Sequence, residues 1–299
     1  MTQEAVRATL IGTGAVLSWA LLALLTAASG DVPPLQLTAM SFAIAFAIAV
    51  TVWGVRGLNP LRRLRQPPAA WALGVAGLFG YHAMYFVALR NAPVVEASLI
   101  AYLWPLLIVL FSAMLPGHRV RLYHLAGVVM GLSGAVLIVA RNGIDFDPAY
   151  TAGYLAAVAC ALIWSGYSVL NRQFAGVPTD VVGAFCGVTA IGALILHLLW
   201  EQTVWPASAI QWLAVLALGL GPVGGAFFLW DVGTKRGDLR VLGALSYLAP
   251  LLSTLVLIAT GNAAATWQVL AACLLITAGA ALASLDMLRR RPHPPVDAV

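Results

Sequence analysis

One six-residue pattern, a tyrosine followed three positions later by a proline, occurs twice in the chain, as "YLWPLL" from Tyr102 and as "YLAPLL" from Tyr247. A proline inside a helix cannot donate to the carbonyl four residues earlier, so Pro105 and Pro250 each leave one backbone acceptor free. Such an acceptor must face another protein group or water. A packed kink would explain one proline equally well, but the matched pair beside tyrosines predicts two hinges that line a common cavity.

Aromatic rings and hydroxyl groups recur at helical spacing around these motifs. Ring stacking and burial suit a substrate with a ring or an apolar side chain, and ring faces attract an ammonium group by about 0.5–2 kcal/mol. Taken singly, each Tyr or Ser is at least as well explained by a hydrogen bond to a neighbouring helix. The candidate substrate-binding residues are Tyr81, His82, Tyr85, Ser98, Tyr102, Trp104, Trp164, Tyr167, Ser168, Trp230, Ser246 and Tyr247.

Ionisable side chains are few inside the apolar stretches, and they are functional candidates because burying a charge is costly. Glu96 is close in sequence to Arg90, which favours a structural ion pair. Asp231 stands four residues before Lys235, which favours an i,i+4 pair. His82 has no evident partner, and a substrate contact and a structural hydrogen bond explain it equally well.

None of these groups forms a catalytic or metal-binding constellation. Cys160, Cys186 and Cys273 have spacings unlike a metal-ligand set. The run "GLGPVG" matches a nucleotide-binding fingerprint, but it contains a proline and follows no strand. Neither HExxH nor GxSxG is present. We therefore expect no enzyme activity, no metal and no cofactor.

The elements that carry these residues are predicted to be membrane-spanning helices. The chain has 299 residues, 62% of them hydrophobic and 9% charged, with a mean hydropathy of +0.93, whereas a soluble domain carries roughly 25% charged residues. Apolar runs of roughly 20 residues recur along the chain, which excludes the alternating strands of a β-barrel. The fold class is all-α, with ten spans near 7–28, 34–55, 69–89, 94–115, 121–140, 150–172, 179–200, 210–233, 239–260 and 264–287.

Arginine and lysine are distributed unevenly over the ends of these spans, and the richer side is normally cytoplasmic. Fourteen fall on one side: Arg7, Arg56, Arg62, Arg63, Arg65, Arg119, Arg121, Arg172, Lys235, Arg236, Arg240, Arg289, Arg290 and Arg291. Only Arg90 and Arg141 fall on the other. Both termini are therefore predicted to be cytoplasmic, in a multi-pass protein of the bacterial inner membrane. The net charge of +5 marks this topology, and nucleic acid is not an expected partner.

The sequence also matches itself at an offset of 145 residues. Trp19 then aligns with Trp164, and the two tyrosine–proline motifs align with each other. Two units of five spans result, 1–145 and 146–290, followed by a short cytoplasmic tail at 291–299. Because five is odd, the second unit is predicted to lie upside down in the membrane. Such inverted repeats support alternating access in transporters.

The stretches "GYHAMYF", "ALRNAP" and "EASLIAYLWPLL" resemble the drug/metabolite transporter superfamily, and within it the EamA-type bacterial exporters with ten helices. The resemblance covers essentially the whole chain. It implies a basket of helices around a central cavity lined by the third, fourth, eighth and ninth spans, and it implies export of aromatic and other amphiphilic amino acids. At the offset of 145, Ala249 stands in place of Trp104 and Trp230 in place of Tyr85, so an asymmetric cavity is expected.

A multidrug or paraquat-type exporter of organic cations is the main alternative, which a transport requirement for Glu96 or Asp231 would favour. A membrane scaffold or sensor is disfavoured, because no sizeable soluble domain interrupts the spans. The expected partners are a small amphiphilic substrate and the lipid bilayer, with the chain acting as a monomer. Tryptophans near span ends are predicted to be interfacial anchors: Trp53, Trp71, Trp200, Trp205 and Trp212.

Overall fold

A computed structural model describes residues 2–115, 120–140, 143–144, 146–261 and 264–285 of the chain. All regular structure in these ranges is helical. The first half contains α1 (Gln3–Trp19), α2 (Leu22–Ala28), α3 (Pro34–Val55), α4 (Pro60–Leu64), α5 (Pro68–Val75), η1 (Ala76–Gly80), α6 (Tyr81–Asn91), α7 (Val94–Ala101), α8 (Trp104–Ser112) and α9 (Leu122–Val139). The second half contains η2 (Pro148–Tyr150), α10 (Thr151–Leu170), η3 (Asn171–Phe174), η4 (Thr179–Val181), α11 (Val182–Trp200), α12 (Ala209–Leu220), α13 (Gly225–Arg236), α14 (Leu239–Leu245), α15 (Leu248–Ala259) and α16 (Trp267–Ala283).

Nine helical segments among the described residues are long and apolar enough to cross a membrane, and each coincides within a few residues with a predicted span. They are Gln3–Ala28, Pro34–Val55, Pro68–Asn91, Val94–Ser112, Leu122–Val139, Pro148–Phe174, Thr179–Trp200, Ala209–Arg236 and Leu239–Ala259. The shorter apolar helix Trp267–Ala283 occupies the place of the tenth predicted span, which stays a prediction. The predicted tail at 291–299 lies outside the described residues.

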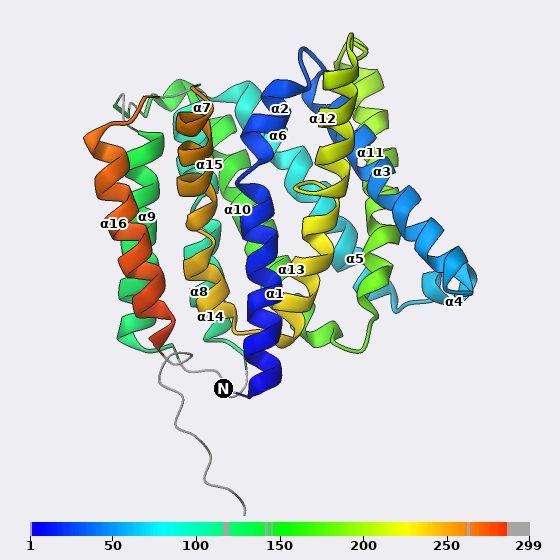
Figure 1. Ribbon diagram of the computed structural model, residues 1–299, viewed down its shortest axis with the longest axis horizontal. Helices are drawn as coiled ribbons and strands as arrows, with labels where there is room; N and C mark the ends of the chain where they lie inside the picture. Colours follow the sequence, from blue (N-terminus) through cyan, green and yellow to red (C-terminus); the bar gives the residue numbers. More distant parts are fainter. Residues whose placement is uncertain (1, 116–119, 141–142, 145, 262–263, 286–299) are drawn as a thin grey trace, which may run out of the picture.

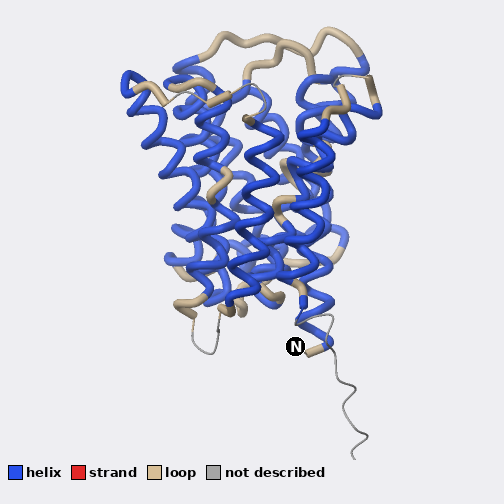
Figure 2. Tube along the Cα trace, turned by 90° about the vertical axis from the view of Figure 1, so that its left-hand side faces the viewer, coloured by secondary structure: helices blue, strands red, loops and turns tan. Residues whose placement is uncertain are grey.

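The helices lie side by side, and their connecting loops gather at the two ends of the bundle (Figures 1 and 2). The start of α1, the end of α16 and the start of α14 lie at the lower end in Figure 1, with α4 toward the lower right. We call this the basic end, because α1, α4, the end of α13 and the start of α14 carry arginines there. Arg90, at the end of α6, belongs to the opposite end.

Two helices break where the prolines predict it. The fourth span is interrupted between α7 and α8, which begins one residue before Pro105. The ninth span is interrupted between α14 and α15, whose third residue is Pro250. Proline is tolerated in the first turn of a helix because its missing N–H has no partner there. Figure 2 shows such loop segments partway between the two ends.

Other interruptions were not predicted. The eighth span opens at residues 221–224 between α12 and α13, in the run that resembles a nucleotide-binding fingerprint. Its counterpart 145 positions earlier is η1, one turn of π-helix. The first span breaks between α1 and α2, where the Trp19 indole N–H donates to the Pro222 carbonyl oxygen at 3.0 Å. This bond gives a partner to a carbonyl that the break in the eighth span exposes.

Helices related by the 145-residue offset pack in related ways. Counterparts α3 and α11 pack against each other, as do counterparts α9 and α16. Helix α1 packs on α13, and their respective counterparts α10 and α6 also form a pair. Glycines permit the closest approaches: a Cβ atom added to Gly127 would lie 2.5 Å from the Gly279 carbonyl oxygen. Small residues let membrane helices approach through their backbones.

The tryptophans predicted as interfacial anchors do not all behave alike. Trp200, Trp205 and Trp212 are exposed, as an anchor must be. Trp53 is only 1% exposed and packs in one cluster with Ala184 of α11, so its interpretation as an interfacial anchor is wrong. Its position near a span end was visible in the sequence, but the side of the helix on which α11 packs was not.

Candidate substrate-binding site

Four tryptophans from four different helices form one block of rings at the level of the helix breaks. Trp19 ends α1, Trp104 begins α8, Trp164 lies in α10 and Trp230 lies in α13. All six pairs of ring centroids are separated by 5.1–6.2 Å. We call these residues the tryptophan block. Three of them were candidates from the sequence, and Trp19 was missed although its match to Trp164 in the repeat marked it.

A layer of smaller aromatic residues from α6 adjoins the block. The rings of Tyr81 and Tyr85 stack with centroids 6.1 Å apart, and Tyr81 contacts Trp164 at 5.2 Å. The Tyr85 hydroxyl interacts with Ser98 of α7, and Tyr102 lies near enough to Tyr85 for an electrostatic interaction. The structure therefore brings together candidates that were predicted on two separate spans.

His82 belongs to the same layer. Its Nδ1 lies 2.7 Å from the Leu78 carbonyl oxygen, and its ring packs edge-on against Phe42 at 5.1 Å. A carbonyl only accepts, so Nδ1 carries the proton, and Nε2 of the neutral ring is left as an acceptor. The hydrogen bond is structural, yet it orients a lone pair that can receive a proton donor of a bound molecule. The structural interpretation of His82 is therefore confirmed, and the substrate contact, which is compatible with it, stays a prediction.

The residues of this layer share partial exposure. None is fully buried and none is on the open surface, whereas the candidates from the second half are all buried. The partly exposed residues are Tyr81, His82, Tyr85, Ser98 and Tyr102. The buried candidates of the second half are Trp164, Tyr167, Ser168, Trp230, Ser246 and Tyr247. Trp104 of the first half is also buried.

Most buried candidates use their polar groups within the protein. The Trp230 indole N–H donates to Ser168 Oγ at 3.0 Å, and Ser246 Oγ donates to the Leu242 carbonyl at 2.7 Å. Tyr167 differs, because its buried hydroxyl has no hydrogen-bond partner in the described part of the chain. The polar groups of Trp230 and Ser246 therefore stabilise the wall of the site and are not free to donate to a substrate.

The two tyrosines of the repeated motif meet each other. The Tyr247 hydroxyl donates to the Tyr102 carbonyl oxygen at 3.1 Å, and Tyr247 is fully buried. Tyr102 itself is partly exposed. Tyr247 thus braces the break in the fourth span, whereas the Tyr102 side chain is accessible.

The two broken helices are packed together at one end only. Toward the basic end, α14 packs on α8, and a Cβ atom added to Gly243 would lie 2.8 Å from the Pro105 carbonyl oxygen. Among the described residues the counterpart pair, α7 and α15, shares no comparable contact. Gly243 is not among the residues predicted to bind substrate, and its counterpart at the offset of 145 is Ser98. We call the packed end, which is also the basic end, the closed end.

The buried charges near the site are paired. Asp231 lies 2.9 Å from Lys235 Nζ, as predicted, and it also accepts from Asn171 at 3.0 Å and Thr179 at 2.6 Å. Arg90 is paired differently from the prediction: it lies 3.7 Å from a carboxylate oxygen of Glu201. Glu201 also accepts from the first backbone N–H groups of α3 and lies 3.0 Å from His197. That the partner of Arg90 comes from the loop after α11 was not visible from local spacing.

Known proteins were compared with the whole chain. The EamA-like transporter family matches residues 6–140 and again residues 151–285. The protein named aromatic amino acid exporter YddG from Ancylobacter novellus is 55% identical over 280 residues, covering 93% of this chain and 97% of its own length. The YddG protein of Salmonella typhimurium is 24% identical over 83% of this chain and 86% of its own.

Two further similarities extend the comparison. The pseudopaline exporter CntI of Pseudomonas aeruginosa is 30% identical over 69% of this chain and 71% of its own length. A crystal structure with 53% sequence identity superposes with a TM-score of 0.90 and covers 95% of this chain and 99% of that one. The relatives with printed names are exporters rather than enzymes, as predicted for this chain. The family matches both halves of the chain, and one relative is 55% identical over nearly the whole of it. The chain is therefore a multi-pass membrane protein that belongs to the EamA-like transporter family.

Proposed function

We propose that this protein exports amino acids with aromatic or other apolar side chains across the bacterial inner membrane by alternating access. The names of its relatives, two YddG aromatic amino acid exporters and a pseudopaline exporter, support this class of substrate. The observation that carries the proposal is the layer of partly exposed tyrosines and His82 against the tryptophan block. It combines a surface for rings with donors and acceptors for a polar end.

The substrate side chain would lie against Tyr81, Tyr85 and the tryptophan block, where apolar burial and ring contacts stabilise it. The ammonium group would be attracted by ring faces, by about 0.5–2 kcal/mol. It can also donate to Nε2 of His82, the acceptor that the Leu78 hydrogen bond leaves free. Hydroxyl groups of Tyr102 and Ser98 can donate to the carboxylate.

We further propose that 1–145 and 146–290 are two five-helix units of opposite orientation, giving ten spans with both termini in the cytoplasm. The two family matches and the packing of counterpart helices support two equivalent units. The start of α1 and the end of α16 at the basic end support a common side for the termini (Figure 1), and basic ends are normally cytoplasmic. A single chain would hold the whole pathway and act as a monomer.

In this orientation the closed end faces the cytoplasm, and the partly exposed layer is reached from outside. The conformation would then be outward-facing. The inward-facing form would separate α14 from α8 and bring α7 onto α15, with Pro105 and Pro250 as the two hinges. Both states use the same contacts with the roles of the units exchanged, which is the mechanism that inverted repeats make available.

A counterflow experiment tests the function. Proteoliposomes loaded with unlabelled phenylalanine are expected to accumulate labelled phenylalanine, tryptophan and leucine faster than protein-free vesicles, while aspartate and lysine are excluded. The same rates with and without a pH gradient would indicate uniport, and a dependence on the gradient would indicate proton coupling. Equal rates for every amino acid in loaded, empty and protein-free vesicles would refute export of amino acids.

No observation favours the alternative of an organic cation exporter over this proposal. Asp231, one carboxylate that could bind a cation, is already neutralised by Lys235 at 2.9 Å. Methyl viologen belongs in the counterflow panel for this reason. Transport of methyl viologen without any transport of phenylalanine would establish the alternative.

A further inference from the structure

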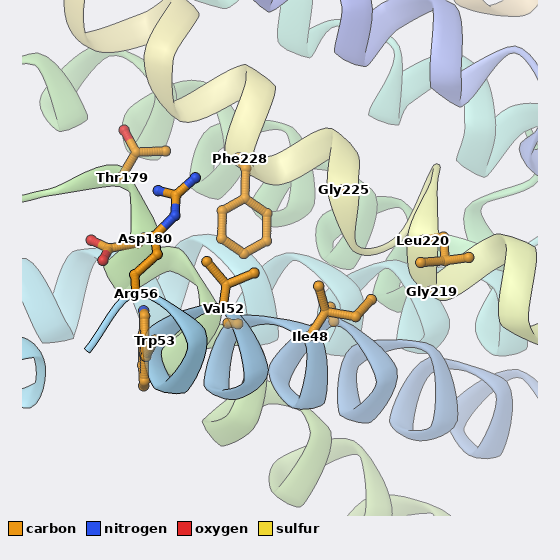
Figure 3. A pocket seen from close by; sticks show the side chains of 12 residues that line it. Ile48, Val52, Trp53, Arg56, Thr179, Asp180, Gly219, Leu220, Gly225 and Phe228 are labelled. Atoms are coloured by element: carbon orange, nitrogen blue, oxygen red, sulfur yellow. The ribbon is translucent and has the colours of Figure 1, made fainter. Parts of the chain in front are cut away.

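A pocket of about 380 Å³ lies outside the aromatic site, between α3, η4 and the break from α12 to α13 (Figure 3). It contains none of the candidate substrate-binding residues. Its lining divides into a polar mouth and an apolar interior. The mouth consists of Trp53, Arg56, Thr179 and Asp180, and the interior of Ala45, Ile48, Ala49, Val52, Gly219, Leu220, Gly225 and Phe228.

The mouth holds one cation that the protein leaves unpaired. The Arg56 side chain is exposed and forms no hydrogen bond or ion pair within the described part of the chain. The Trp53 indole N–H has no partner among the described residues either, but it is enclosed by protein atoms and has almost no accessible surface. Asp180 carries the opposite charge, but one of its oxygens lies 3.1 Å from Arg63, which neutralises it. An exposed cation at the end of an apolar pocket suits an anionic oxygen, such as that of a phosphate.

The pocket, from its apolar interior to its polar mouth, has about the length of one leaflet of a bilayer. Its α3 residues lie at spacings of three and four, so they form one face of the helix. From Ala45 to Arg56 the helix rises about 16 Å, and half of the bilayer hydrocarbon core is about 15 Å. Gly219 and Gly225 flank the break between α12 and α13, and Leu220 and Phe228 supply the side chains of the opposite wall. An extended hydrocarbon chain fits this face.

The surroundings of the mouth are those of a membrane surface. Helix α4 follows α3 directly and carries Arg62 and Arg63. Its Leu61 and Leu64 are 67% and 41% exposed, the pattern of a short helix that lies in the interface. Each basic residue near an anionic membrane surface contributes about 1 kcal/mol of attraction.

We propose that this pocket binds one anionic phospholipid of the leaflet at the basic end. The phosphate accepts from Arg56, and one acyl chain lies along α3 between Val52 and Ala45.

Native mass spectrometry on the delipidated full-length protein, titrated with defined lipids, tests the proposal. Phosphatidylglycerol is expected to bind at one site more tightly than phosphatidylcholine. Arg56→Gln should weaken phosphatidylglycerol binding about fivefold, the effect of about 1 kcal/mol. Arg7→Gln is the matched control, because Arg7 is also exposed at the basic end but lies outside the pocket, and it should bind phosphatidylglycerol as the wild type does.

A second variant and a second ligand separate a lipid site from general attraction by charge. Val52→Phe fills the interior without changing any charge and should also abolish the single site, in a protein shown to be monodisperse. Glycerol 3-phosphate, which has the anion but no acyl chain, should not compete. Equal weakening in Arg56→Gln and Arg7→Gln, equal binding of both lipids, or competition by glycerol 3-phosphate would each overturn the proposal.

Discussion

The two tyrosine–proline motifs have nearly the same sequence but opposite surroundings. Around Tyr247 the side chains are buried, α14 packs on α8, and Gly243 allows the closest approach. Around Tyr102 the side chain is partly exposed, and α7 has no comparable contact with α15 in the described part of the chain. The helix break is therefore a local property of the motif, whereas its exposure depends on which end of the bundle is packed.

The largest effect is expected from a wedge at the closed end. In Gly243→Val, the added side chain would meet the Pro105 carbonyl and Val109, each 2.8 Å from the added Cβ position. Overpacking costs about 1–3 kcal/mol, which would shift the equilibrium away from the closed end by roughly 5- to 150-fold. Transport should fall strongly, while the protein remains folded.

The shift is measured by labelling a cysteine placed at Leu242, which is fully buried at the closed end. In a background without the three native cysteines, Gly243→Val should speed reaction of Leu242→Cys with an impermeant maleimide. Gly166→Val is the control, because a Cβ atom there meets nothing within 4 Å. Equally fast labelling in both variants would show that general loosening, not the α14–α8 contact, is responsible.

Trp19 and Trp164 extend the comparison to a second pair of counterparts. Trp19→Phe removes the donor to the Pro222 carbonyl at 3.0 Å as well as part of the ring contacts. An unsatisfied buried acceptor costs about 1–3 kcal/mol. The Trp164 indole N–H forms no hydrogen bond to a described residue. Trp164→Phe should therefore lower the unfolding temperature less than Trp19→Phe. The reverse order would contradict the role given to the Trp19 hydrogen bond.

Much of this arrangement could be predicted from residue types and spacing. The apolar runs predicted the spans, Pro105 and Pro250 predicted two helix breaks, and Asp231 with Lys235 predicted an ion pair. These features are local, because each depends on a few consecutive residues. The anchor role of Trp53 and the pairing of Arg90 with Glu96 were predicted wrongly, because the burial of Trp53 and the actual partner of Arg90, Glu201, depend on which elements pack alongside.

The break between α12 and α13 shows a further limit. Glycines at 219, 221, 224 and 225 permit an open turn, yet the counterpart η1 remains helical as a π-turn. Trp19, which reaches the Pro222 carbonyl from the first span, is 203 residues away in sequence. Contacts between residues so far apart in the sequence decide whether the segment opens or stays helical, and the sequence of one segment alone does not reveal them.

Smaller effects, of a different kind for each residue, are expected from replacing the two motif tyrosines. Replacement of either by alanine should impair transport without loss of expression. Tyr247→Phe removes one hydrogen bond, worth about 0.5–1.5 kcal/mol, so labelling of Leu242→Cys should rise by roughly 2- to 12-fold with KM little changed. Tyr102→Phe should instead raise KM and leave labelling unchanged. Identical effects of the two phenylalanine variants would remove the distinction between a brace and a substrate contact.

The smallest expected effect is the opening of the closed end at acidic pH. Asp238 lies between α13 and α14 at the closed end; its backbone N–H donates to Thr9 of α1 at 2.8 Å, and its carboxylate accepts from Arg240 Nε at 2.9 Å. Burial disfavours its charged form, but the hydrogen bonds and charge of Arg240 outweigh burial and lower the pKa of Asp238 below its ordinary value of 3.8.

A carboxylate with a lowered pKa stabilises the closed end at any pH above the ordinary pKa of 3.8, and this contribution is lost as the pH falls through the lowered pKa. Labelling of Leu242→Cys after pre-equilibration should therefore be constant from neutral pH to about 5 and should rise only below about 4. Asp238→Asn should remove that rise. The counterpart position on the other unit is Pro93, which has no charge, so an acid-dependent opening that survives in Asp238→Asn would have to come from elsewhere in the bundle.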